Sequence, residues 1–223
     1  MNLNEKIGHF VLKYLAVPRA PKVIDGKIHI ACIGDSITFG AGVNGKKTQT
    51  WEYYLEEKLP ADHQVLNYGI SGRTLQDEGD YPYRAEKFYQ ISKDIKAEVY
   101  LIMLGTNDAK TYNWDERRYR KQFIDLISEY RDLPQRPRVI AMTPPQCFEE
   151  EKTGIVAFDI DKNNIDGPIC RIIFEEAKKL NVEVIDLHEY TKDHPEWFVD
   201  GVHPNAEGDR KIAEKISRSF AGV

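Results

Sequence analysis

Short runs of apolar and β-branched residues recur along the chain and predict strands. Their continuous apolar character is clearest between Val99 and Leu104, and it is typical of strands covered on both faces of a parallel sheet. Five segments share this pattern: Ile28–Ile33, Val65–Tyr68, Val99–Leu104, Val139–Met142 and Val182–Leu187.

Between these runs, apolar residues recur at helical spacing. Such stripes indicate helix faces that pack on a sheet, and they give no sign of a cofactor role. The last stripe predicts a C-terminal helix with Asn205 as its N-cap. The stripes are Trp51, Tyr54, Leu55 and Leu59; Phe88, Ile91 and Ile95; Tyr119, Phe123, Leu126, Ile127 and Tyr130; Ile165, Ile169, Ile172, Ile173 and Leu180; and Ile212, Ile216 and Phe220.

The alternation of strands and helices predicts an α/β fold. Right-handed crossovers between parallel strands would give a three-layer α/β/α sandwich around a five-stranded sheet. We find no repeat, low-complexity tract or linker, so residues 1–223 are expected to form one domain, with residues 1–26 as an N-terminal helical extension. A short amphipathic helix is expected over His9–Val17. The longest irregular stretch, Thr143–Asn163, is expected to lie over one edge of the sheet.

Composition narrows the function classes. The net charge of −5 over 223 residues argues against a nucleic-acid-binding protein, which would carry a basic stripe. No apolar run approaches the roughly 18 residues that a membrane span requires. The cysteines and histidines show no metal-ligand spacing, so neither a metal nor another cofactor is expected.

The three cysteines form no disulfide pattern, which favours a reducing, cytoplasmic compartment; secretion stays open if a signal peptide has been removed. Cys32 and Cys170 are expected in the core. Cys147 falls in a loop and is the one expected to be exposed.

Gly34-Asp35-Ser36 follows the first predicted strand. In a parallel α/β sheet the ligand crevice lies outside the carboxyl ends of the strands, which makes Ser36 a candidate nucleophile. The simpler interpretation is that Asp35 and Ser36 only cap a following helix. The Gly-x-Ser-x-Gly elbow of the α/β-hydrolases is absent from the sequence.

Asp200-Gly201-Val202-His203 supplies a possible base for such a serine. A carboxylate three residues before a histidine can accept a hydrogen bond from its Nδ1–H and leave Nε2 free to face Ser36. Two other histidines in the same region, each beside an aspartate, remain rival bases: His188, which directly follows the last predicted strand, and His194.

Two further strand-end segments could stabilise an oxyanion. Gly72 lies in the segment after the second predicted strand and offers an unobstructed backbone N–H, while Asn107 follows the third and carries a side-chain amide. Each segment could equally be an ordinary turn, because glycine, asparagine and aspartate are the usual turn residues.

Four blocks together resemble the SGNH hydrolases, also called GDSL esterases/lipases. The blocks occur in that family's order and extend from about residue 28 to the C-terminus. They are Gly34-Asp35-Ser36, Gly69-Ile70-Ser71-Gly72, Gly105-Thr106-Asn107-Asp108 and Asp200-Gly201-Val202-His203-Pro204. Two positions depart from the usual pattern, with Ile37 in place of the more frequent leucine and Thr106 in place of a common glycine.

The resemblance implies a flavodoxin-like sandwich and metal-free ester hydrolysis through an acyl-enzyme. It makes Ser36 the nucleophile, His203 the base and Asp200 the residue that orients the base. It also implies an oxyanion hole formed by the N–H groups of Ser36 and Gly72 and the amide of Asn107.

The loops around the expected crevice carry aromatic and polar residues that suit a sugar, namely Arg73, Tyr81, Tyr83, Lys110, Tyr112, Trp114, Trp197 and Phe198. The stretch from Asn107 to Trp114 resembles a branch of the family that includes carbohydrate O-acetylesterases, which favours a short-chain, above all acetyl, ester on a saccharide or another small molecule as the substrate. Asp35, Arg73 and Trp114 are expected to support the site or to bind substrate. The same aromatics could instead only pack the loops.

Other functions remain open at this stage. A lysophospholipase or acyl thioesterase would use the same site. A flavodoxin-like binding protein without activity would share the fold, although the sequence has no glycine-rich phosphate loop.

Overall fold

The computed structural model describes residues 17–43 and 47–221. Within them a single parallel sheet forms, with strand order β2-β1-β3-β4-β5. Its strands are β1 (Ile28–Gly34), β2 (His63–Gly69), β3 (Val99–Met103), β4 (Arg138–Met142) and β5 (Glu183–Ile185). All five predicted strands are therefore present, and the predicted fold class is confirmed.

Helices of varied length connect the strands. The α-helices are α2 (Ser36–Phe39), α3 (Trp51–Glu56), α4 (Lys87–Asp94), α5 (Glu116–Arg131), α6 (Lys162–Asn164), α7 (Cys170–Leu180), α8 (Leu187–Thr191) and α9 (Ala206–Ser217). The 3₁₀ turns are η2 (Ala41–Val43), η3 (Tyr83–Ala85), η4 (Ala157–Asp159), η6 (Pro195–Trp197) and η7 (Arg218–Phe220), and the π-helical turn η5 (Ile165–Ile169) leads into α7.

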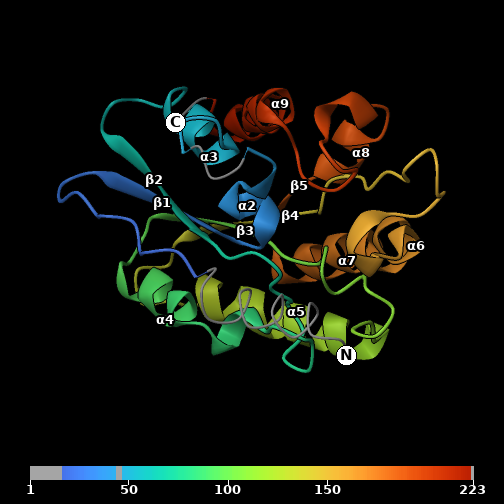
Figure 1. Cartoon of the computed structure of the whole chain (residues 1–223). Helices are drawn as coiled ribbons and strands as arrows, with labels where there is room; N and C mark the ends of the chain where they lie inside the picture. Colours follow the sequence, from blue (N-terminus) through green and yellow to red (C-terminus); the bar gives the residue numbers. More distant parts are fainter. Residues whose placement is uncertain (1–16, 44–46, 222–223) are drawn as a thin grey trace.

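The helices cover both faces of the sheet, as Figure 1 shows: α3, α8 and α9 on one face and α4, α5 and α7 on the other. Successive residues of β1 point to opposite faces. Ile30 and Cys32 therefore join a core beneath α3 and α9, whereas Ala31 and Ile33 join the larger core against α5 and α7. This two-sided burial explains why the strands are apolar throughout.

The end of β5 differs from the expectation. The sequence pattern extends the strand to Leu187, but Asp186 caps a short helix by accepting a hydrogen bond from the Glu189 N–H at 3.0 Å. Leu187 is therefore the first residue of α8, and the apolar run ends in a helix.

The irregular stretch after β4 lies at the carboxyl ends of the strands. Its backbone is joined to the loop before α9 by a 2.8 Å hydrogen bond from the Phe148 N–H to the Gly201 carbonyl. The expectation that Cys147 is exposed is wrong: only 1% of it is accessible, and it belongs to the same buried apolar cluster as Val202. Cys147 is buried because this hydrogen bond of the neighbouring Phe148 keeps the segment packed against the loop before α9.

The N-terminal expectation is tested only in small part. Residues 1–16 lie outside the described residues, and with them almost all of the helix predicted over His9–Val17. Residues 17–24 form no helix, so this portion of the predicted helical extension is not helical. Within the described part of the chain, no helix is long and apolar enough to cross a membrane.

Candidate active site

Ser36 is the first residue of α2, directly after β1. Asp35 caps this helix by accepting a hydrogen bond from the Ile37 N–H at 3.0 Å, which is the capping role that the sequence left open. Gly34 has no room for a side chain, because a Cβ there would collide with Thr38 and with the Met103 carbonyl. The tight strand-to-helix turn places the Ser36 hydroxyl at the carboxyl edge of the sheet.

His203 lies on the loop between η6 and α9 and meets Ser36 across 167 residues of sequence. Its Nε2 is 2.8 Å from the Ser36 Oγ, and its Nδ1 is 2.7 Å from the Asp200 Oδ2. The other carboxylate oxygen of Asp200 accepts hydrogen bonds from the backbone N–H groups of Val202 and His203, at 3.0 and 2.8 Å. Asp200 therefore fixes both the imidazole ring and the loop that carries it.

His188 is placed elsewhere. Its Nε2 lies 3.4 Å from the Asp166 carboxylate, and it is His203 that contacts Ser36. The structure thus brings His203, the histidine favoured by the Asp-x-x-His spacing, into contact with Ser36. The rival His188 contacts Asp166 instead.

Gly72 and Asn107 face the same space as Ser36. Gly72 has a φ of 82°, a left-handed conformation that glycine adopts without strain. The Asn107 side-chain Nδ2 donates to the Arg73 carbonyl at 3.2 Å and lies 3.5 Å from the Asp35 carboxylate. The loops after β2 and β3 therefore hold the Asn107 amide beside the Ser36 turn.

A second carboxylate ties these two loops together. Asp108 accepts hydrogen bonds from the N–H groups of Leu75 and Gln76, both at 2.8 Å. Its carboxyl group is fully buried, and burial raises the pKa of Asp108 to about 6 despite these hydrogen bonds.

Asp35 lies in a similar environment. Burial raises the pKa of Asp35 to about 6, while the Ile37 N–H and the charge of His203 oppose the rise. Asp200 behaves in the opposite way. Its partial burial pushes its pKa up, but the hydrogen bonds from His203 outweigh this effect and lower the pKa of Asp200 below its ordinary value. The carboxylate that contacts His203 therefore stays ionised to lower pH than an ordinary aspartate does.

The Ser36 cavity has a volume of about 280 Å³. Ser36, Gly72, Asn107 and His203 lie on its wall. Apolar and polar groups complete the lining, namely Ala41, Ser71, Thr106, Lys110, Phe158, Ile160 and Val202. The Lys110 ammonium is 3.3 Å from the Asp80 carboxylate, which balances its charge.

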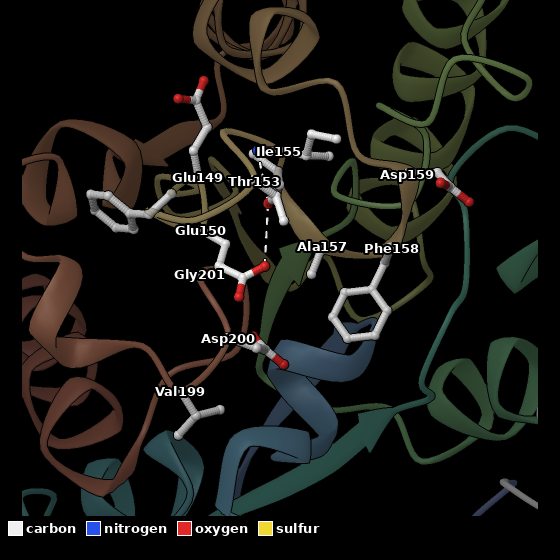
Figure 2. A pocket seen from close by; sticks show the side chains of 12 residues that line it. Glu149, Glu150, Thr153, Ile155, Ala157, Phe158, Asp159, Val199, Asp200 and Gly201 are labelled. Carbon is white, nitrogen blue, oxygen red and sulfur yellow. Dashed lines mark hydrogen bonds between the residues drawn. The ribbon is translucent and has the colours of Figure 1, made fainter.

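A larger cavity, of about 680 Å³, adjoins the first. It is bounded by the segment from Phe148 to Asp159 and by Val199, Asp200 and Gly201 (Figure 2). Phe158 lines both cavities, and its ring meets the His203 ring edge-on at 5.1 Å between centroids. The two cavities therefore flank one aromatic side chain.

Phe158 and Asp159 both have left-handed backbone conformations, with φ values of 65° and 59°. Non-glycine residues in this region carry strain of order 1–3 kcal/mol each. The sequence pattern predicts only an irregular stretch here, and no local motif marks Phe158, because the position of its ring depends on how the loop turns.

Two residues expected to support the site or bind substrate lie outside both cavities. The Arg73 side chain is fully buried, with its guanidinium donating to Glu86 at 2.6 Å and to the Ser71 carbonyl at 2.7 Å. Trp114 packs against Tyr119 with ring centroids 5.5 Å apart. From its buried position, Arg73 thus fixes the loop that carries Gly72. Trp114 forms part of the packing around α5.

The other aromatics expected near the crevice mostly pack loops, as the simpler interpretation held. Tyr83 donates to the Tyr68 carbonyl, while Trp197 stacks on His194. Tyr81 and Phe198 are buried, and Tyr112 is exposed. Among residues 17–43 and 47–221, no group of three or more His, Cys, Asp or Glu side chains could hold a metal ion.

Comparison with known proteins gives the family. A model of the GDSL-like lipase/acylhydrolases matches residues 30–216. The chain belongs to this family. Membership confirms the resemblance seen in the four sequence blocks, and the family's description as lipases and acylhydrolases agrees with the predicted class, a carboxylic ester hydrolase.

Relatives and solved structures add detail. The chain is 32% identical over 220 residues to an acetylxylan esterase of Xylanibacter ruminicola, covering 90% of this chain and 44% of that protein. It therefore spans less than half the length of the curated relatives it matches. The fold is similar to that of the lipase/acylhydrolase from Enterococcus faecalis, with a TM-score of 0.69, 23% identity and coverage of 87% and 95% of the two chains. A carbohydrate acetylesterase from Sinorhizobium meliloti matches with a TM-score of 0.61, 18% identity and coverage of 87% and 99%.

Proposed function

We propose that this chain is a serine esterase that removes short acyl groups, above all acetyl, from a carbohydrate through an acyl-enzyme. One observation carries the proposal: Ser36, His203 and Asp200 form a continuous line of contacts, with Ser36 Oγ 2.8 Å from Nε2 and Nδ1 2.7 Å from the carboxylate. A serine, an imidazole and a carboxylate in this order are the groups that acyl transfer requires.

In the first half of the reaction, His203 accepts the Ser36 proton at Nε2 while Oγ attacks the ester carbonyl. Asp200 holds the Nδ1–H and stabilises the imidazolium that forms. The imidazolium then gives the proton to the departing alcohol oxygen. In the second half, His203 takes a proton from water, the hydroxide oxygen attacks the acyl carbon, and the proton returns to Ser36 as the carboxylic acid leaves.

The tetrahedral oxyanion would be held by the N–H groups of Ser36 and Gly72 and by the Asn107 amide. Support comes from the position of all three residues on the Ser36 cavity. The Asn107 amide is already oriented by the Arg73 carbonyl, so little rearrangement is needed when charge develops on the substrate.

The choice of a short acyl group is supported by the size of the Ser36 cavity. Its 280 Å³ lies just below the range for ligand sites, about 300–1,000 Å³, and part of it must hold the reacting carbonyl. The similarity to an acetylxylan esterase supports acetyl as the acyl group and a saccharide as the alcohol. A lysophospholipase or a long-chain thioesterase would need more room on the acyl side.

The test compares four purified variants on acetylated xylan oligomers and on p-nitrophenyl acetate. Ser36→Ala and His203→Ala are expected to lower kcat by about 10⁴-fold or more, with unchanged circular dichroism. The matched controls are Ser217→Ala, whose hydroxyl donates to the Glu214 carbonyl, and His188→Ala, the rival histidine. Both should retain parental rates.

Three results would contradict the proposal. If Ser36→Ala kept the parental rate, the nucleophile would be wrong. If His188→Ala lost as much activity as His203→Ala, the base would be misassigned. If octanoyl esters were cleaved faster than acetyl esters, the lysophospholipase or thioesterase alternative would replace the acetylesterase.

A further inference from the structure

The cavity beside Asp200 has no part in the mechanism above, yet its wall includes Asp200, which contacts His203, and Phe158, which also lines the Ser36 cavity. Figure 2 shows the Phe158 ring, the Glu150 carboxylate and Asp200 turned toward a common space. Phe158 is 53% exposed, although its ring contacts the ring of His203. So large an exposure is unusual for a phenylalanine. A large exposed aromatic at a cavity rim next to a reactive group is typical of a binding surface.

We propose that this cavity binds the alcohol portion of the ester, a sugar, and that Phe158 is the surface on which the sugar ring rests. The inference depends on the proposed function, since it assigns the second half of that substrate. Phe158 then separates the acyl group, in the Ser36 cavity, from the sugar, in the larger cavity.

The chemistry of the leaving group indicates where the alcohol portion of the ester must lie. The departing alcohol oxygen must come within hydrogen-bond distance of His203 Nε2, because that nitrogen supplies its proton. The atoms attached to this oxygen therefore lie beside the imidazole. The Phe158 ring contacts this imidazole and also lines the larger cavity.

The lining suits a saccharide. A sugar ring presents an apolar C–H face, which packs on an aromatic ring, and hydroxyl groups that donate to carboxylates. Glu150 accepts one hydrogen bond from Thr153 Oγ1 at 3.2 Å, and its carboxylate has capacity for more. The cavity volume of about 680 Å³ falls within the range for ligand sites.

The loop also holds Phe158 in place. Ile160 forms a bridge with Lys110, and the Asp161 N–H donates to the Ala109 carbonyl at 3.2 Å, while Phe148 binds Gly201 at the other end. These contacts hold Phe158 in its left-handed conformation. Backbone strain of this kind occurs preferentially at ligand and active sites, where the surroundings fix it.

The test compares two acetate esters that differ only in their alcohol: acetylated xylotriose and ethyl acetate. Because Phe158 also lines the Ser36 cavity and contacts His203, Phe158→Ala is expected to lower kcat/KM on both esters, but about tenfold more on acetylated xylotriose, mainly through KM, than on ethyl acetate. Phe158→Tyr should keep the parental preference. Phe158→Leu, which retains bulk but not the ring, should show most of the loss even if the alanine variant folds poorly.

Phe174→Ala is the matched control, because Phe174 is an exposed phenylalanine on α7 that lines neither cavity. A direct readout is the binding of unacetylated xylotriose to the Ser36→Ala protein by calorimetry. Adding Phe158→Ala to that protein should weaken binding, and adding Phe174→Ala should not.

Equal losses on both esters would overturn the proposal and give Phe158 a role in positioning His203 alone. Unchanged rates on both would overturn it as well. If the parent protein cleaves ethyl acetate but not acetylated xylotriose, the carbohydrate substrate is wrong and the subsite is lost with it. If the parent cleaves both and the Phe158 variants do not discriminate, the esterase stands and only the subsite is wrong.

Discussion

The two walls of the active site are built differently. On the Ser36 side, three short strand ends converge, and Ser36, Gly72 and Asn107 are fixed by caps, a glycine turn and buried hydrogen bonds. On the Phe158 side, a segment without strands crosses the front of the site, and it contains two adjacent left-handed residues and an exposed aromatic ring.

In the proposed function, the Ser36 side carries out the chemistry and the Phe158 side selects the alcohol. The strand ends are rigid because the sheet is buried on both faces, so they can hold reacting groups to within fractions of an ångström. A loop tolerates changes in length and sequence more easily, which makes it the part of the fold that can vary the alcohol without disturbing the nucleophile.

The largest effect that separates the two walls is expected from Asn107→Ala. Removing one oxyanion donor typically costs about 10²–10³ in turnover, because the developing charge loses a fixed hydrogen bond in a water-poor site. We expect kcat to fall by this factor on both acetylated xylotriose and ethyl acetate. Steady-state kinetics with the two esters measures it.

Asn163→Ala is the control for this variant. Asn163 is exposed and its amide donates to Asp161 at 2.9 Å, so its loss should leave the rate unchanged. A loss for Asn107→Ala restricted to the sugar ester would mean that the Ser36 side also selects the alcohol, and the division between the walls would fail.

A smaller effect is expected in the pH dependence of stability. Burial raises the pKa of Asp35 from 3.8 to about 6, so the native state keeps this proton to higher pH than the unfolded state does. The stabilisation is complete below pH 4 and is lost as pH rises through about 6. This difference in pKa corresponds to about 3 kcal/mol of unfolding free energy.

Asp35→Asn should remove that dependence while its side-chain oxygen still caps α2. Urea unfolding at pH 4.5 and 7.5 is expected to show a smaller decrease in unfolding free energy for the variant than for the parent. Asp193→Asn, at an exposed position, should behave like the parent. A variant with the full parental decrease would show that Asp35 is not the source of this pH dependence.

Much of the Ser36 wall could be predicted from sequence because its signals are local. An apolar run gives each strand, and the polar residues directly after a parallel strand must lie at one edge of the sheet. The contact between His203 and Asp200 also follows from a three-residue spacing. These features need no knowledge of how distant loops fold.

The Phe158 wall could not be predicted in this way. Trp114 was expected near the crevice because it follows Asn107 closely in sequence, but it packs against Tyr119 of α5 instead. Phe158 lies 45 residues before His203 in the chain, and only the left-handed turn at 158 and 159 brings its ring there. Such a conformation is set by tertiary contacts, which leave no periodic trace in the sequence.

The smallest effect concerns the strain in that turn. Asp159 is exposed, and glycine adopts its φ of 59° without cost, whereas a non-glycine residue in this conformation is about 1–2 kcal/mol less favourable. Part of this gain is offset because glycine also makes the unfolded chain more flexible. We therefore expect Asp159→Gly to raise the unfolding free energy by about 1 kcal/mol or less, measured by urea unfolding.

Arg136→Gly provides the matched case, because Arg136 is also exposed and left-handed, with a φ of 51°, but lies far along the chain from both cavities. Both variants should gain stability. Only Asp159→Gly should lose activity on acetylated xylotriose, because a relaxed turn holds the neighbouring Phe158 less firmly against His203. If Asp159→Gly were destabilised while Arg136→Gly was stabilised, the Phe158 wall would be held by contacts of Asp159 itself and not by a strained turn.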